Sequence, residues 1–135
     1  MPGLLIDTSA LIVLADRSDD RHSEALHIRR TVARGRLYVT DYVLDETVTL
    51  LIRRGGSRTA HLLMDEVRAR RAFELIFVGP ELFWKSEARM RKLADQAPSF
   101  TDCTSFSVMD HLRLDAAFAF DDDFIRAGYR VVPFD

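Results

Sequence analysis

The stretch Leu4-Leu5-Ile6-Asp7-Thr8-Ser9-Ala10-Leu11 starts with three apolar residues and leads, without a glycine, into a second apolar segment with helical spacing. An apolar run this short and continuous predicts a strand that is covered on both faces. Asp7 comes directly after that strand. A carboxylate taken out of water is costly unless something positive compensates it. The stretch therefore predicts a buried parallel strand with an acidic group at its carboxyl end.

The same alternation of short apolar runs and helix-like segments continues along the whole chain. The helix-like segments show apolar residues three and four positions apart, as in Ala60, Leu63, Met64 and Val67. This alternation predicts an α/β fold, a three-layer sandwich with a central parallel sheet. The predicted strands are Leu4–Ile6, Leu37–Val39, Leu75–Val78, Ala116–Phe120 and Val131–Phe134.

Length and composition limit the classes of protein to which the chain can belong. Its 135 residues indicate one domain, 1–135, with a core of its own. No apolar run reaches the roughly 20 residues of a membrane span, and the early first strand leaves no room for a signal peptide. The single Cys103 excludes an internal disulfide and favours a reducing cytoplasm. A net charge of −2 gives no overall attraction to nucleic acid, so phosphate contacts must come from local patches.

Four acidic residues lie where such a fold places a ligand. Asp7 and Asp121 follow predicted strands, Asp102 opens a helix, and Glu46 lies within a helix. In open parallel sheets, ligands bind beyond the carboxyl ends of the strands. Several carboxylates at one such edge make a site for a hard divalent cation. The sequence thus predicts a carboxylate metal site at this edge.

Helix capping is the structural alternative for three of these acids. Asp7 is a suitable N-cap, the neighbouring Thr101 is a candidate cap for the helix of Asp102, and Asp121 precedes a short helix. In the run Asp121-Asp122-Asp123, Asp121 is nearest the strand, Asp123 is a helper or a substitute, and Asp122 is expected to be solvated.

Glu46 needs a different argument because it lies in the middle of a helix. At about 100° per residue, Glu46 borders the apolar stripe formed by Val43 and Leu50, whereas Asp45 points away. A glutamate at the edge of a buried face needs a partner, which is either a metal ion or Arg53, two turns away.

Other α/β sites that use acids or phosphate loops are excluded by particular residues. A dehalogenase-type phosphatase needs a second aspartate at the position of Ser9. A receiver domain needs a lysine near the last strand, where none follows Lys92. A nucleotide-binding loop needs glycines after the first strand. A carboxylate-only metal site is what remains.

Four motifs in register resemble those of the PIN domain. They are Leu5-Ile6-Asp7-Thr8-Ser9, Thr40 to Glu46, Ser99 to Phe106, and Ala119-Phe120-Asp121-Asp122-Asp123-Phe124. Together they span nearly the whole chain, at a length typical of VapC-type toxin ribonucleases.

This resemblance implies a single PIN-like nuclease domain that hydrolyses RNA with Mg²⁺, or with Mn²⁺ as a substitute, as the toxin of a type II toxin–antitoxin pair. Asp7 and Asp102 would hold metal directly, and Glu46, Asp121 and Asp123 would do so directly or through water. Thr8 or Ser9 would orient a carboxylate or a water. The implied partners are a cognate antitoxin protein, whose helix would lie along Leu50, Leu51, Leu62 and Leu63, and a second copy in a homodimer. The alternatives are a housekeeping PIN nuclease in RNA maturation and a non-catalytic module that binds RNA or protein.

Basic and aromatic residues lie between the predicted site residues in the sequence and have more than one possible role. Arg68, Arg70 and Arg71 either stabilise a helix terminus or bind RNA phosphates. Phe83 and Trp84 are candidates for base stacking, for the core or for a dimer interface. The pattern alone leaves these alternatives open.

Overall fold

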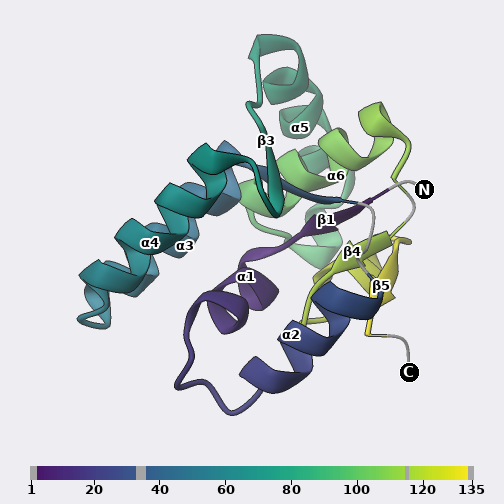
Figure 1. The fold of residues 1–135 in the computed structure, drawn as a ribbon. Coiled ribbons are helices and arrows are strands. Elements are labelled where there is room, and N and C mark those ends of the chain that lie inside the picture. Colours follow the sequence, from purple (N-terminus) through teal and green to yellow (C-terminus); the bar gives the residue numbers. More distant parts are fainter. Residues whose placement is uncertain (1–2, 33–35, 115, 134–135) are drawn as a thin grey trace.

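The computed structural model describes residues 3–32, 36–114 and 116–133. Within these residues, a parallel sheet alternates with helices along the chain, as the α/β prediction requires (Figure 1). The elements are β1 (Leu4–Ile6), α1 (Thr8–Ala15), α2 (His22–Thr31), β2 (Leu37–Thr40), α3 (Asp41–Arg53), α4 (Ser57–Ala69), β3 (Phe73–Ile76), α5 (Pro80–Lys92), a 3₁₀ turn (Ala94–Gln96), α6 (Phe100–Leu112), β4 (Ala116–Phe118), α7 (Asp123–Arg126) and β5 (Arg130–Val132).

The described strands form one parallel sheet in the order β3-β2-β1-β4-β5. From β1 the chain steps outward to β2 and β3, and it then crosses back to β4 on the other side of β1. The strand order therefore reverses between β1 and β4. This is the point where an open parallel sheet leaves a crevice at its carboxyl edge.

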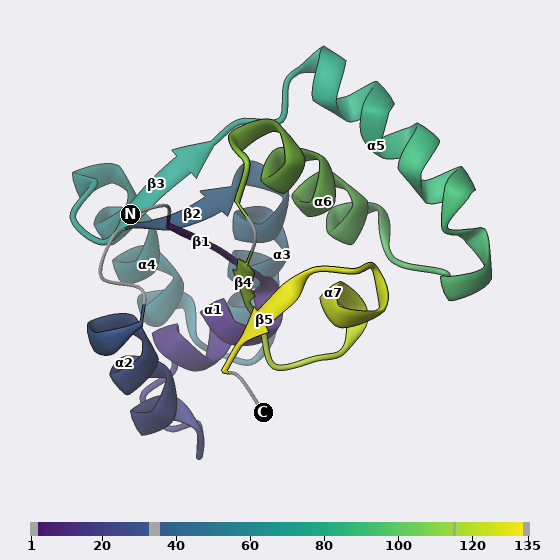
Figure 2. The ribbon, with the colours of Figure 1, turned by 90° about the vertical axis from the view of Figure 1, so that its right-hand side faces the viewer.

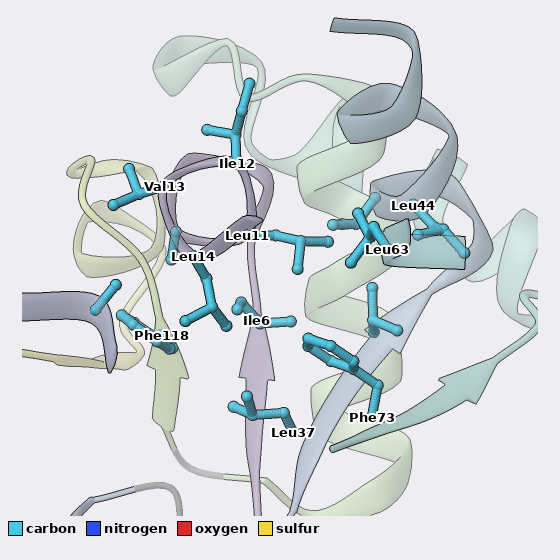
Figure 3. Packing of buried hydrophobic residues seen from close by; sticks show 14 of the residues in the cluster. Ile6, Leu11, Ile12, Val13, Leu14, Leu37, Leu44, Leu63, Phe73 and Phe118 are labelled. Atoms are coloured by element: carbon cyan, nitrogen blue, oxygen red, sulfur yellow. The ribbon is translucent and has the colours of Figure 1, made fainter. Parts of the chain in front are cut away.

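Helices cover both faces of the sheet, so the prediction of a three-layer sandwich is confirmed. Leu4 and Ile6 of β1 face one core with α1 to α4, whereas Leu5 between them faces the other core with α6 and α7. Figure 2 shows α5, α6 and α7 gathered on one side of the strands. In the first core, Leu11 and Leu14 of α1 pack over Ile6 (Figure 3). Side chains that alternate between two buried faces explain why the strands read as unbroken apolar runs.

Several strand bounds differ from the prediction. β2 ends one residue later, at Thr40, and β5 starts one residue earlier, at Arg130. β3 and β4 end early because residues remote in sequence bind an amide just past each of these strands.

The third strand is Phe73–Ile76 rather than Leu75–Val78, because β2 pairs with it only as far as Thr40. Beyond that pair, α3 begins and the Asp41 carboxylate accepts a hydrogen bond from the Val78 amide at 2.9 Å.

The fourth strand ends at Phe118, two residues earlier than predicted. Its last pair with β1 is Ile6–Phe118. The Phe120 amide then donates to the Ser9 hydroxyl at 2.9 Å instead of to a neighbouring strand. Asp121 is therefore three residues past the strand, not directly after it. The fifth strand is Arg130–Val132, and the predicted end at Phe134 is outside the described residues.

The resemblance implied that Leu51 and Leu63 line a groove for the antitoxin helix, and the structure does not bear this out. Both are buried in the first core, where α3 and α4 pack together. Over the described ranges, the helices are too short or too polar for any of them to cross a membrane.

Candidate active site

Asp7 is held at the carboxyl end of β1 by the start of α1. It is the N-cap of α1, and its side chain is only 3% exposed. The carboxylate accepts a hydrogen bond from the Ser9 hydroxyl at 2.9 Å and a longer one from the Ser9 amide. Because Ser9 also accepts the hydrogen bond from Phe120, this one serine joins Asp7 to the segment that leads to Asp121. The capping function and a ligand function are therefore compatible at Asp7.

Asp102 is held by a capping box at the start of α6. Ser99, not Thr101, is the N-cap: its hydroxyl accepts from the Asp102 amide at 3.0 Å, and the Asp102 carboxylate accepts from the Ser99 amide at 3.4 Å. Thr101 is the second residue of the helix, so the prediction that it caps was wrong. The signal that was missed is the spacing Ser99-x-x-Asp102, the pattern of a capping box with aspartate in place of glutamate.

Asp121 and Asp123 complete the acidic edge from the β4–α7 segment. Both are half-buried, whereas Asp122 is exposed, as predicted. The Asp121 carboxylate accepts from the Asp123 amide at 3.2 Å. Asp123 forms an ion pair with Arg126 of α7. Asp123 thus has a basic partner, and Asp121 has none among the described residues.

The electrostatics of Asp7 and Asp102 show that the acids lie close enough to repel one another. Burial raises the pKa of Asp7 to about 7, and repulsion from Asp121 and then Asp102 adds to the rise. Burial also raises the pKa of Asp102 to about 6, with further contributions from Asp123 and Asp121. The hydrogen bonds from Ser9 and Ser99 oppose these shifts without cancelling them. Neither Asp7 nor Asp102 has an ion pair in the described part of the chain.

Glu46 differs from Asp7, Asp102, Asp121 and Asp123 in its exposure. It is exposed, like its neighbour Asp45, while Val43 and Thr47 on the same helix are buried. No hydrogen bond or ion pair of Glu46 is present within the described residues, so the salt bridge with Arg53 does not form there. Its place in the site stays a prediction.

The donor set fits a divalent cation in its chemistry. It consists of carboxylate oxygens, the ligands that Mg²⁺ and Mn²⁺ prefer. Two of the carboxylates, those of Asp7 and Asp102, are desolvated and have no ion pair within the part of the chain that the structure describes. Among the described residues, no three acidic, His or Cys side chains already form a group arranged to hold a metal ion.

Two hydroxyl groups near the acids have no partner among the described residues. Thr8 Oγ1, next to Asp7, and Ser105 Oγ, on the helix of Asp102, are both buried and make no hydrogen bond. A buried polar atom usually has a partner. The resemblance left open whether Thr8 or Ser9 orients a carboxylate. In the structure it is Ser9 that donates a hydrogen bond to the Asp7 carboxylate.

A cleft of about 330 Å³ borders the acidic edge, and sequence patterns did not reveal it. Phe120, Asp121 and Ile125 contribute to its lining, and the Arg21 guanidinium lies 3.8 Å from the centre of the Phe120 ring. Arg21 is thus a second arginine near the acidic edge, besides Arg126. No local pattern marks Arg21, because it comes from the loop before α2.

The predicted basic cluster near Arg70 lies elsewhere. Arg70 and Arg71, with Arg36, line a cleft at the amino ends of β2 and β3, and Arg36 and Arg70 both pair with Glu74. The acids are at the carboxyl ends. The cluster therefore does not form a rim around the acidic site.

Comparison with known proteins identifies the family and the fold of the chain. The family model of the PIN domain matches residues 4–129. The chain is 32% identical over 127 residues to the 23S rRNA-specific endonuclease VapC20 of Mycobacterium tuberculosis, covering 93% of this chain and 95% of that protein. The crystal structure of VapC20, described as a sarcin–ricin loop cleaving toxin, is similar with a TM-score of 0.86 at 31% identity, covering 94% and 96% of the two chains. A DNA-bound VapBC structure from Salmonella typhimurium shares the fold, with a TM-score of 0.68 at 14% identity and 97% coverage of each chain.

Replacing Asp7 by asparagine should stabilise the protein in the absence of divalent cations. The ordinary pKa of 3.8 rises to about 7 in the folded state, so ionisation of Asp7 costs stability progressively as pH rises from about 4 to 7. Asparagine keeps the N-cap and has no charge. At pH 8 with EDTA, urea unfolding should show Asp7→Asn to be more stable than wild type by roughly 1–3 kcal/mol, and the difference should vanish near pH 4.

The exposed Asp45→Asn is the matched control and should show no such difference. A variant Asp7→Asn that is less stable than wild type at pH 8 would mean that the charge of Asp7 is compensated in the folded protein.

Proposed function

This chain belongs to the PIN-domain family of nucleases, and we propose that residues 1–135 act as a single divalent-metal-dependent endoribonuclease domain, the toxin of a type II toxin–antitoxin pair. One observation supports the metal dependence: Asp7 and Asp102, from different elements, are buried near Asp121 at the switch point of the sheet, and neither has an ion pair among the described residues. The similarity to VapC20 supports RNA as the substrate and makes 23S rRNA the first substrate to test.

We assign the site residues by how each is held. Asp7 and Asp102 are the direct ligands, because a hydroxyl or a capping box fixes each of them. Asp121 and Asp123 complete the shell directly or through water. Glu46 joins them from α3, and one contact supports this: Tyr42, one turn earlier on the same face of α3, packs against Phe100 at the start of α6 with ring centres 5.9 Å apart.

The chemistry follows from this donor set. When bound, Mg²⁺ or Mn²⁺ supplies a Lewis acid that lowers the pKa of a water molecule and stabilises charge on the phosphate oxygens. The protein holds Asp7 in one orientation through Ser9, and it removes both Asp7 and Asp102 from water by burying them. No histidine is needed as a base.

The proposal includes two protein partners and a cytoplasmic location. On the α3–α4 pair, Ile52, Leu62 and Met64 are 49%, 55% and 41% exposed. These side chains are the apolar surface that we assign to the antitoxin, with a basic side chain of the antitoxin near the acids. A second copy of the chain completes a homodimer.

The first test is RNA cleavage with and without metal. Wild-type protein should cut 23S rRNA with Mg²⁺ or Mn²⁺, and EDTA should stop cleavage. Asp102→Asn should lose more than the roughly 100-fold that removal of an outer-shell partner costs, while Asp65→Asn, exposed on α4, should cut normally. Undiminished cleavage in excess EDTA would exclude the metal mechanism, and mapping of the cut ends would identify the substrate site.

The second test separates adjacent acids on α3. Glu46→Gln should reduce cleavage far more than Asp45→Asn, because Glu46 borders the apolar stripe of Val43 and Leu50, whereas Asp45 points away from it. Both residues are exposed, so neither change should alter the fold. Equal losses, or a larger loss at Asp45, would remove Glu46 from the site.

The third test concerns the toxin assignment. Expression of the wild-type chain should slow growth, and expression of Asp7→Asn should not. Co-expression with a small neighbouring gene should restore growth and give a complex that copurifies, and Leu62→Asp should weaken that complex without reducing cleavage. Harmless wild-type expression of a protein that does cut RNA would favour a housekeeping nuclease instead.

A further inference from the structure

The cleft of about 330 Å³ beside the β4–α7 segment brings arginines next to the acidic edge. Its charged lining consists of Arg21 and Arg130 together with Asp121 and Asp122, and aromatic and aliphatic side chains, Phe120 among them, form the rest. The volume is within the range of about 300–1,000 Å³ that is usual for sites that bind small molecules. A cleft with this lining can hold a group that is both anionic and partly apolar, such as one nucleotide.

The cleft and the acidic site share Asp121. Asp121 lines the cleft, and its negative charge contributes to the raised pKa of both Asp7 and Asp102. The neighbouring Phe120 also lines the cleft, and its amide donates to the Ser9 hydroxyl, which in turn donates to Asp7. The cleft therefore begins where the acids end, and a chain bound at the acids can continue into it.

Arg21 is held at this cleft by three contacts, although its side chain is 47% exposed. Its backbone amide donates to the Asp19 carboxylate at 2.8 Å, and its guanidinium lies 3.8 Å from the centre of the Phe120 ring. Two of the five N–H groups of the guanidinium donate to Glu24, at 3.0 and 3.3 Å. The other three have no acceptor within the described ranges. A guanidinium that is fixed in place and keeps several donors is suited to binding a phosphate.

The charges of the site determine which part of an RNA Arg21 can bind. A divalent cation at the acids offsets their charge and stabilises the phosphate that is cut. The next phosphate along the RNA meets the acids of the cleft, which repel it. Arg126 pairs with Asp123, a proposed ligand, so it is tied to the acids themselves, whereas Arg21 pairs with Glu24, which is not among the proposed ligands. Arg21 thus provides positive charge for that neighbouring phosphate.

We propose that this cleft holds a phosphate of the RNA next to the one that is cut, and that Arg21 binds this phosphate. The inference rests on the proposed ribonuclease function and adds to it a contact that positions the substrate. The arginines around Glu74 cannot make this contact, because they lie at the opposite edge of the sheet. The alternative is a structural role, in which Arg21 and Phe120 only attach the α1–α2 loop to the β4–α7 segment.

The salt dependence of cleavage tests a phosphate contact directly. For an RNA that the wild-type protein cuts, kcat/KM is measured at constant Mg²⁺ over a series of NaCl concentrations. Arg21→Gln should reduce the slope of log kcat/KM against log salt by roughly 0.7–0.9, the contribution of one phosphate, and should lower kcat/KM roughly five- to eightfold at 0.1 M NaCl. The loss should be the same for RNAs of different base sequence, since a phosphate carries no sequence information.

Two matched variants separate charge from structure. Arg21→Lys keeps the positive charge but loses the planar group that stacks on Phe120, so it should retain most of the salt slope. Arg91 on α5 is another exposed arginine that pairs with a nearby glutamate, Glu87. Arg91→Gln changes the net charge by the same amount and should cleave normally. Circular dichroism should confirm that all variants fold.

Substitution in the RNA identifies the phosphate that Arg21 binds. Each phosphate that flanks the cut is replaced in turn by an uncharged methylphosphonate. One of these replacements should cost the wild-type protein about as much as Arg21→Gln does. The same replacement should cost the Arg21→Gln protein little more, because both changes remove the same contact.

Three outcomes would overturn the inference while the ribonuclease function stands. The first is an unchanged salt slope in Arg21→Gln. The second is an equal loss in Arg21→Gln and Arg21→Lys with a lowered melting temperature in both, which would make the contact with Phe120 structural only. The third is a loss that depends on base sequence, which would mean that the cleft binds a base. If the wild-type chain cuts no RNA, the proposed function and this inference fail together.

Discussion

Repulsion among desolvated carboxylates is the interaction around which the carboxyl edge of this protein is built. Asp7 and Asp102 are both nearly buried, and each feels at least two other acids. A charge in that position is costly without a counter-charge. The sheet topology makes the conflict unavoidable, because the order β3-β2-β1-β4-β5 brings the ends of β1 and β4 side by side. The fold therefore concentrates negative charge where it also leaves a crevice.

Hydrogen bonds from uncharged donors offset part of the free-energy cost of burying these carboxylates, and they also fix the orientation of the carboxylate groups. The Ser9 hydroxyl donates to Asp7 and accepts from the Phe120 amide, so it replaces the next rung of the β1–β4 ladder. At the start of α6, the Ser99 amide donates to the Asp102 carboxylate, and the Ser99 hydroxyl accepts from the Asp102 amide. These contacts hold the two carboxylates in place without neutralising them. A site organised in this way keeps its charge for a cation.

The sequence predicted the sheet and most of this edge because both depend on local patterns. Unbroken apolar runs correspond to strands covered on both faces, and Leu4–Ile6 was predicted to the residue. The early end of β4 was not predictable, because Phe118, Ala119 and Phe120 are equally apolar. What ends the strand is the hydroxyl of Ser9, 111 positions away in the chain. The end of β3 depends in the same way on Asp41, which is remote in sequence and binds the Val78 amide.

The residues of the site likewise divide into those with a local sequence signal and those that depend on contacts remote in sequence. Ser99-x-x-Asp102 carried a local signal that was available, whereas the contact of Arg21 with Phe120 joins two loops and has no local signature. For Glu46, helical phase placed the residue beside a buried stripe, and the structure leaves it exposed. Periodicity gives the direction of a side chain on its own helix, but not what the neighbouring elements cover. That depends on the packing of α3 against α6.

The basic side chains whose contacts place them near the acidic edge are already paired: Arg21 with Glu24, and Arg126 with Asp123. An arginine beside a carboxylate stabilises its charged form and competes with a cation for it. Asp123 would therefore have to leave Arg126 before it could bind a cation. Asp7 and Asp102, for which the described residues provide no ion pair, face no such competition, and this difference is why they rank before Asp123 as direct ligands.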